Sequence, residues 1–198
     1  SEAVGHFNDV ESLMVYEDDH LLIINKPAGM AVHGGSGVNV GVIESLRHAR
    51  PEGNRLELVH RLDRGTSGCL MVSKRRSYLR LLQDALRKPG QIRKHYLAVV
   101  HGRWSRKMIQ IEQPLLTSSI AGKERVTRVN GQGKYAVTDF SLLEANDEMS
   151  IVRASPRTGR THQIRVHARW GRHPLVGDTR YGDQTLDQTS GIEGRLML

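Results

Sequence analysis

The residues best placed to do chemistry lie in the segment His60-Arg61-Leu62-Asp63-Arg64, where one carboxylate stands between two arginines. Flanking guanidinium groups keep an aspartate ionised, because an opposite charge nearby favours the charged form. A carboxylate held in this way is suited to act as a nucleophile or as a base. The alternative is structural: Asp63 would cap a turn through backbone groups of Thr66 and Ser67, and residue types alone do not decide between the two.

A second polar cluster coincides with a helix that we predict over residues 161–170, with Thr161 as its N-cap. The helical repeat places His162, Arg165 and Arg169 along one side of this helix. Such a polar stripe is suited to the wall of a cleft. A solvated helix face gives the same pattern more often, so residue types alone leave both interpretations open.

Tyr96 is the aromatic residue best placed to meet a nucleic-acid base. It follows Arg93-Lys94-His95 and begins an apolar segment that predicts a strand over residues 96–101. A tyrosine ring in a basic setting can stack on an extruded base. Tyrosine is also a common residue of strand cores, and pattern alone favours that role.

Patterns typical of other catalytic sites are missing from the sequence. The ten histidines include no His-x3-His pair, and neither a cysteine pair nor a compact acidic cluster accompanies them, so we predict no metal site. The glycine-rich segment at residues 34–37 lacks the spacing and the following lysine of a phosphate-binding loop. A Gly-x-Ser-x-Gly elbow is also missing.

The charge balance favours a polyanionic partner. The 198 residues carry a net charge of +8, and 22 of the 29 basic residues are arginines, whose planar guanidinium group suits phosphates and stacked bases. Seven arginines and a single acid, Asp178, lie between residues 153 and 180. So much like charge repels itself unless a polyanion lies against it, although a generally basic, solvated surface is the alternative.

The order of predicted elements indicates an α+β fold, with a mixed, largely antiparallel β-sheet flanked by helices and loops. Strands are predicted over residues 13–17, 21–25, 56–60, 69–74, 96–101, 108–112, 125–129, 137–145 and 149–155, and helices over residues 40–50, 77–88 and 161–170. Ser77 would cap the second of these helices, with Leu79, Leu82 and Leu86 on its inner face. Without internal repeats or low-complexity linkers, residues 1–198 are predicted to form a single domain.

Cys69 is the only cysteine, so no internal disulfide is possible, and its apolar surroundings predict a buried thiol in a reducing compartment. The N-terminal segment carries acids and lacks the basic-then-apolar pattern of a signal peptide. No apolar run in the sequence approaches the roughly 20 residues that span a bilayer. We therefore expect a soluble, cytoplasmic monomer without a membrane partner.

Four segments of the sequence, taken in order, resemble motifs of the pseudouridine synthases typified by the large-subunit ribosomal enzymes. They are Asn25-Lys26-Pro27-x-Gly29, His60–Asp63 followed by Thr66–Gly68, Lys94-x-Tyr96 with the strand up to Gly102, and Gly159–His167 continuing to Gly177–Gly182. The resemblance covers nearly the whole chain and outweighs the structural interpretations of Asp63, Tyr96 and Arg165. Residues 31–37 and 41–44 are most similar to the C-type 23S rRNA enzymes of that family.

The resemblance implies a pseudouridine synthase fold and the isomerisation of uridine in RNA, above all in 23S rRNA, without a cofactor. The N1–C1′ bond of a flipped-out uridine would break, and the base would rejoin the ribose through C5. By analogy with the family, Asp63 would attack C1′ or assist the departure of uracil, and Arg165 would pair with Asp63. Tyr96 would stack on uracil and remove the C5 proton. Lys26 would shape the floor of the cleft.

The resemblance also implies contacts to RNA. Arg61 would enter the space that the flipped nucleotide leaves, which a planar guanidinium can fill by stacking. The other RNA-binding candidates are Arg64, Arg157, Arg160 and His162. Two alternatives stay open: the same chemistry on tRNA, and a non-catalytic RNA-binding module.

The sequence departs from the family pattern in three places. Gly65 stands where the family often has an acid. The N-terminal S4-like RNA-binding domain of many relatives is expected to be absent. The sequence also stops at Leu196-Met197-Leu198, where relatives continue into another strand.

Overall fold

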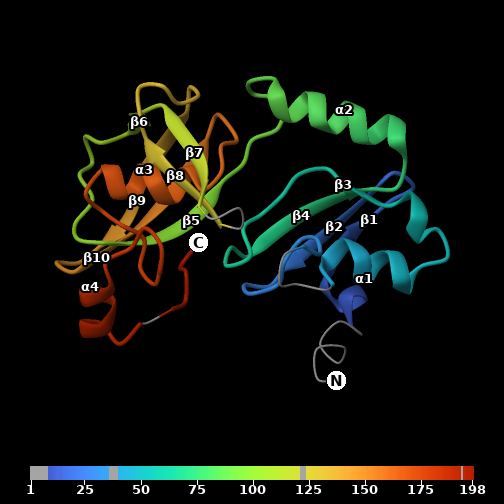
Figure 1. Ribbon diagram of the computed structural model, residues 1–198, viewed down its shortest axis with the longest axis horizontal. Helices are drawn as coiled ribbons and strands as arrows, with labels where there is room; N and C mark the ends of the chain where they lie inside the picture. Colours follow the sequence, from blue (N-terminus) through green and yellow to red (C-terminus); the bar gives the residue numbers. More distant parts are fainter. Residues whose placement is uncertain (1–8, 36–39, 121–123, 193) are drawn as a thin grey trace. The chain divides into compact units, whose positions relative to one another are not determined.

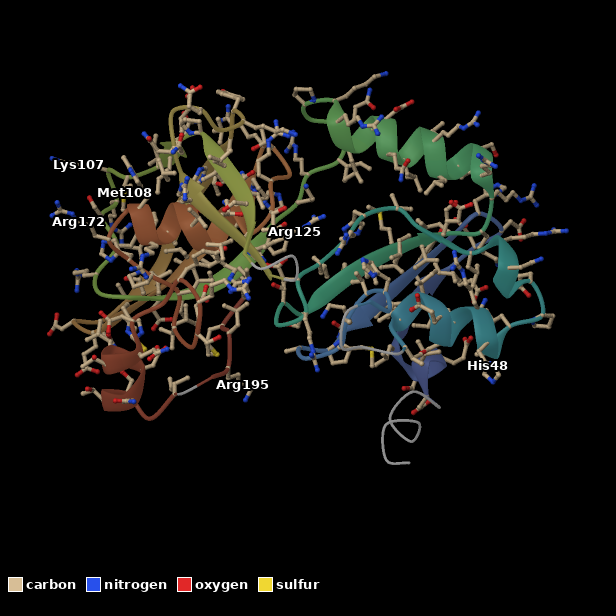
Figure 2. The ribbon with its side chains drawn as sticks, in the orientation of Figure 1. His48, Lys107, Met108, Arg125, Arg172 and Arg195 are labelled. Atoms are coloured by element: carbon tan, nitrogen blue, oxygen red, sulfur yellow. The ribbon has the colours of Figure 1, made fainter. Side chains whose placement is uncertain are left out.

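The computed structural model describes residues 9–35, 40–120, 124–192 and 194–198. Ser36 and Gly37 of the predicted glycine-rich segment lie outside the described residues. The chain forms two compact units, residues 1–92 and residues 93–198 (Figures 1 and 2). Within the described residues, no helix has both the length and the apolar character needed to cross a membrane.

The described residues of the first unit form a four-stranded antiparallel sheet with strand order β1-β2-β4-β3. The elements are η1 (Val10–Leu13), β1 (Met14–Glu17), β2 (Leu21–Lys26), α1 (Val42–Ala49), η2 (Gly53–Arg55), β3 (Glu57–Leu58), β4 (Gly68–Ser73) and α2 (Arg76–Arg87). Because side chains alternate between the faces of a strand, Leu22, Ile24 and Lys26 of β2 share one face, and all three are fully buried. Leu70 and Val72 of the neighbouring β4 are buried as well. Lys26 is therefore buried because it lies on the same face of β2 as these apolar residues.

The described residues of the second unit form a four-stranded sheet of order β5-β10-β9-β6 and a separate hairpin of β7 and β8 (Figure 1). The elements are β5 (Tyr96–His101), β6 (Gln110–Glu112), β7 (Leu115–Ile120), β8 (Glu124–Val129), β9 (Val137–Ala145), β10 (Met149–Pro156), α3 (Gln163–Trp170) and α4 (Gln184–Thr189). The named strands of this unit pair antiparallel. Helix α3 contacts β8, β9 and β10, so its position is set by both sheets.

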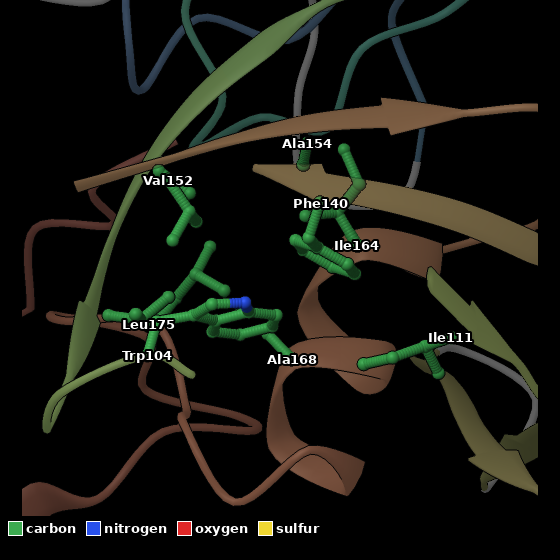
Figure 3. Packing of buried hydrophobic residues seen from close by; sticks show 10 residues of the cluster. Trp104, Ile111, Phe140, Val152, Ala154, Ile164, Ala168 and Leu175 are labelled. Carbon is green, nitrogen blue, oxygen red and sulfur yellow. The ribbon is translucent and has the colours of Figure 1, made fainter. Parts of the chain in front are cut away.

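The core of the second unit is an apolar cluster between α3 and the larger sheet (Figure 3). Trp104 is only 2% exposed, and its ring centroid lies 4.6 Å from that of Phe140 on β9. Ile164 and Ala168, which are one helical turn apart on α3, belong to the same cluster. Tyr96, the first residue of β5, is half-buried against it. The packing of α3 on the sheet thus fixes the direction of its polar side.

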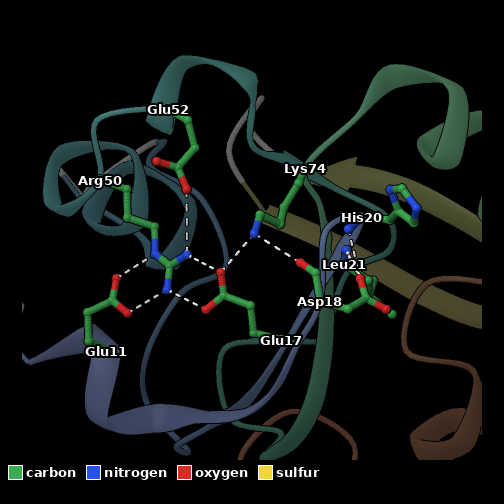
Figure 4. Close-up of polar contacts among 8 residues, drawn as sticks. All are labelled: Glu11, Glu17, Asp18, His20, Leu21, Arg50, Glu52 and Lys74. Atoms are coloured by element: carbon green, nitrogen blue, oxygen red, sulfur yellow. Dashed lines mark hydrogen bonds and ion pairs between the residues drawn. The ribbon is translucent and has the colours of Figure 1, made fainter.

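An ion-pair network stabilises the first unit where β2 begins (Figure 4). Arg50 donates to both carboxylate oxygens of Glu11 at 2.7 Å and to those of Glu17 at 2.6 and 2.9 Å. The Nζ atom of Lys74 donates to Glu17 at 2.9 Å. The hydrogen bonds from Arg50 and Lys74 lower the pKa of the Glu17 carboxyl to about 2. Because Glu17 pairs with the beginning of β2, the network lies at the opposite end of that strand from Lys26.

The predicted fold class is confirmed, since the described strands pair antiparallel and outnumber the helices. The predicted elements are found within two residues of their bounds, except that the strand over residues 56–60 is reduced to β3. The sequence does not predict β7, because Ser118 and Ser119 interrupt its apolar pattern, nor α4, which is short and mostly polar. The predicted burial of Cys69 is wrong: alternation along β4 turns its neighbours to the core and leaves Cys69 exposed.

Two predicted helix caps are also wrong. The N-cap of α3 is His162, whose φ of 55° lies in the left-handed region, so Thr161 stands outside the helix. Helix α2 begins at Arg76, so Ser77 lies inside it. The leucines of its predicted inner face are half-buried. Residue type alone does not locate a helix start, because the backbone angles of the residue before the first turn decide it.

Candidate active site

Asp63 lies in the loop that connects β3 to β4 in the first unit. Leu62 and Thr66 of this loop are buried, whereas Asp63 itself is half-buried. The N–H group of Thr66 donates to the carbonyl oxygen of Asp63 at 3.0 Å and closes a turn. Any residue type could accept this backbone bond, so the bond does not by itself require a carboxylate at position 63.

The buried ammonium group of Lys26 connects the Asp63 loop to the segment that carries the first family motif, Asn25–Gly29. Its Nζ atom donates to the carbonyl oxygens of Pro27 at 3.0 Å, Met30 at 2.8 Å and Arg64 at 3.2 Å. Burial lowers the pKa of Lys26 to about 8, while the charge of Asp63 acts in the opposite direction. An ammonium group has three donors, and three carbonyls accept them here. This arrangement suits a positioning residue whose charge lies near Asp63.

Gly29 and Arg64 hold the two loops together through reciprocal hydrogen bonds. The N–H group of Gly29 donates to the Arg64 carbonyl oxygen at 2.7 Å, and Arg64 Nε donates to the Gly29 carbonyl oxygen at 2.8 Å. Gly29 has a φ of 90°, which favours glycine. Although Arg64 is exposed, its Nε atom is used in this contact between the two loops. The bonds lie directly before Gly65, where the family often has an acid.

In the second unit, Arg165 on α3 makes a bidentate ion pair with Asp178. Its Nε and Nη2 atoms each lie 2.8 Å from a carboxylate oxygen, and both side chains are largely buried. Burial alone would raise the pKa of Asp178, but the hydrogen bond and charge of Arg165, with backbone N–H groups of Tyr181 and Arg180, lower it below its usual value. Arg165 Cζ also lies 4.9 Å from the ring centroid of Tyr181. These contacts orient the guanidinium group.

Tyr181 contacts the residues on the polar side of α3. Its hydroxyl lies 2.6 Å from His162 Nδ1 and accepts the N–H group of Thr127 at 3.0 Å. Arg169 Nη1 donates to the carbonyl oxygen of Tyr181 at 2.8 Å. The prediction that His162, Arg165 and Arg169 lie on one side is therefore confirmed, and what they share there is Tyr181.

The loop between β10 and α3 carries Arg157 and Arg160, both predicted to bind RNA and both exposed. Arg157 Nε donates to Asp139 at 2.6 Å, and Arg160 Nε donates to the carbonyl oxygen of Tyr135 at 2.9 Å. The buried side chain of Gln163 accepts the N–H group of Arg160 at 3.0 Å and donates to the backbone of β9. Gln163 therefore fixes this loop to the sheet.

The predicted site residues are divided between the two units. The first unit carries Arg61, Asp63 and Arg64, and the second carries Tyr96, Arg157, Arg160, His162 and Arg165. Within the first unit, hydrogen bonds join Arg64 to the first motif, and Arg61 is exposed. Within the second unit, contacts to Tyr181 bring His162 and Arg165 together.

Sequence reasoning missed the positioning roles of Asp178 and Gln163. Asp178 is the single acid between residues 153 and 180, a signal that it partners one of the arginines there. Which arginine it meets depends on how the chain folds back after α3, and the sequence does not reveal that. Gln163 carries no comparable signal, because its role depends on the position of β9.

Replacing Asp178 by asparagine is expected to lower the free energy of unfolding by about 2–4 kcal/mol. The amide keeps the shape of the carboxylate, but it replaces the charged acceptor of two hydrogen bonds from the largely buried Arg165 by a neutral one. Urea unfolding followed by tryptophan fluorescence measures the loss, and Asp147→Asn is the matched control because Asp147 is fully exposed. Equal stability of the two variants would show that the ion pair does not hold this part of the fold.

Residues 20–170 match the sequence model of the family described as RNA pseudouridylate synthase, which is more than half of the chain and extends into both units. The chain belongs to this family. The resemblance found in the motifs is thereby confirmed, and so is the pseudouridine synthase fold that it implied.

Curated relatives agree with the family match. The chain is 51% identical over 191 residues to Ribosomal large subunit pseudouridine synthase C of Salmonella typhi and 50% identical to that of Escherichia coli (strain K12). Each alignment covers 94% of this chain and 60% of the relative, so the chain spans about 60% of the length of these proteins. The solved structure of Human RNA Pseudouridylate Synthase Domain Containing 1 is 28% identical with a TM-score of 0.72, and covers 93% of this chain and 74% of that one.

Proposed function

We propose that this chain isomerises uridine to pseudouridine in RNA and that its substrate is 23S ribosomal RNA. The observation that carries the proposal is the Asp63 loop, in which the family's carboxylate motif is intact and Lys26 ties it to the first motif. The relatives named above are ribosomal large subunit enzymes, which favours 23S rRNA over tRNA. They are bacterial, so the proposed place of action is the cytoplasm. Because the family match extends into both units, the chain would act as one catalytic domain.

In this reaction the N1–C1′ bond of uridine breaks, the uracil turns, and C5 bonds to C1′. The C5 proton leaves and N1 gains a proton, so the atoms balance without a redox step or a transferred group. Asp63 would attack C1′ or assist the departure of uracil. Arg165, oriented by Asp178, would pair with Asp63 and keep it ionised. Tyr96 would stack on uracil and accept the C5 proton.

The affinity for RNA is expected to fall steeply with salt. Arg61, Arg64, Arg157 and Arg160 are exposed, and an arginine that contacts a phosphate releases a counterion. Binding of an unmodified 23S rRNA transcript, measured from low to moderate salt, should give a negative log–log slope of roughly 0.7–0.9 per phosphate contacted. A flat response would refute an arginine-lined RNA surface.

Release of tritium from RNA labelled at uridine C5 tests the activity. Unmodified transcripts of 23S rRNA, 16S rRNA and tRNA serve as parallel substrates. The proposal predicts release from 23S rRNA at a level that corresponds to a few uridines. Release from tRNA alone would support the proposed activity but refute 23S rRNA as the substrate. Binding of all three RNAs without release would indicate the non-catalytic module.

A further inference from the structure

Lys94 is a half-buried cation without an anionic partner among the described residues. Burial lowers the pKa of its ammonium group, and no neighbouring acid acts against that effect. In the described part of the chain, its Nζ atom makes neither a hydrogen bond nor an ion pair. A partly desolvated charge without a partner costs free energy, which points to an anion from outside the chain.

The side chain of Lys94 lies on the same side of the chain as Tyr96. His95, the residue between them, contacts Ser155 of β10, with 2.7 Å between Nδ1 and Oγ. This contact continues the register in which Tyr96 stands opposite Ala154. Because side chains alternate along an extended chain, Lys94 and Tyr96 share a face. The cation therefore stands next to the residue proposed to stack on the flipped base.

The ammonium group of Lys94 also lies against the loop that precedes α3. A Cβ atom at Gly159 would come within 3.7 Å of Lys94 Nζ. This loop is held in place by Gln163 and carries the exposed side chains of Arg157 and Arg160. Lys94 thus lies two residues before Tyr96 in the chain and close to a fixed, basic loop.

We propose that Lys94 binds a phosphate group of the RNA backbone beside the flipped uridine. The inference rests on the proposed function, because it takes the nucleotide to lie at Tyr96. A phosphate oxygen would supply the anion that the ammonium group lacks, and lysine binds phosphate as a compact point charge. A neutral uracil carbonyl fits less well, since it would leave the charge uncompensated.

The test compares Lys94→Met, Lys94→Arg and Lys107→Met in the full chain. Methionine keeps the apolar stem and removes the charge, arginine keeps the charge, and Lys107 is an exposed lysine that serves as the control (Figure 2). The dissociation constant for an unmodified 23S rRNA transcript is measured across a salt series, with melting temperature and single-turnover tritium release. Lys94→Met should weaken binding about tenfold at low salt and reduce the log–log slope by about one phosphate. Lys94→Arg and Lys107→Met should keep the wild-type slope.

The other outcomes separate this inference from its alternatives. Lys94→Met should melt no earlier than the wild type, because it removes an unpaired, half-buried charge. An earlier melt with unchanged binding would make Lys94 a packing residue, and an unchanged slope with a slower chemical step would indicate a uracil contact. Either result would refute the phosphate site. Tritium release by the wild-type protein would still support the proposed function. Wild-type protein that binds RNA but releases no tritium would refute the function, and the salt slopes would still decide whether Lys94 meets a phosphate.

Discussion

Replacing Asp63 by asparagine is expected to reduce pseudouridine formation by a factor on the order of 10⁴ or more, while fold and RNA affinity stay nearly unchanged. The amide fits the space of the carboxylate but cannot attack C1′ or stabilise positive charge there. The loop keeps its position, because Lys26 and Gly29 bind the backbone of Arg64 rather than the Asp63 side chain. Tritium release from labelled 23S rRNA under single-turnover conditions measures the loss.

Asp84→Asn is the matched control for this variant, because Asp84 is an exposed carboxylate on α2 in the same unit. It should release tritium at the wild-type rate. Wild-type release by Asp63→Asn would remove Asp63 from the mechanism. Loss of release together with loss of the folded state would instead assign it a structural role.

Replacing Tyr96 by phenylalanine is expected to slow the chemical step by about 10²–10⁴ while RNA affinity stays within a few-fold. Phenylalanine keeps the ring that packs against the Trp104 cluster and would stack on uracil, and it deletes only the hydroxyl proposed as the base. Single-turnover assays with saturating enzyme separate the chemical step from binding. Tyr135→Phe is the control, because the Tyr135 side chain is exposed and only its carbonyl oxygen serves Arg160.

A Tyr96→Phe variant that turns over normally and melts earlier would contradict this role. Tyr96 would then be a core residue of β5, as strand pattern alone suggests. The C5 proton would have to leave by another route.

The elements that carry the site follow from short-range patterns that the sequence displays. Alternation along β2 explains the burial of Lys26 after Leu22 and Ile24, and the apolar face of α3 places Arg165 on its polar side. The same rule corrects the expectation for Cys69, which an apolar run suggested was buried. Alternation assigns it to the exposed face of β4. Where one element decides a residue's environment, the sequence is therefore a good guide.

Partners that lie far apart in the chain were not predictable in the same way. The pairing of Arg165 with Asp178 depends on how the segment after α3 folds back over the helix. The bond from Lys26 to the carbonyl oxygen of Arg64 joins residues 38 positions apart. Because every residue has a backbone carbonyl, the residue type at position 64 does not reveal this bond. The resemblance therefore identifies the motif residues, whereas the contacts that hold them, such as Lys26 to Arg64 and Asp178 to Arg165, come from the structure.

Mapping new pseudouridines at single-nucleotide resolution in unmodified 23S rRNA, after incubation with this chain, shows whether the chain isomerises uridine in that RNA. We expect a small set of discrete positions with the wild-type protein and none with Asp63→Asn. A 23S rRNA that binds the protein but gains no pseudouridine would refute the proposed activity on this RNA.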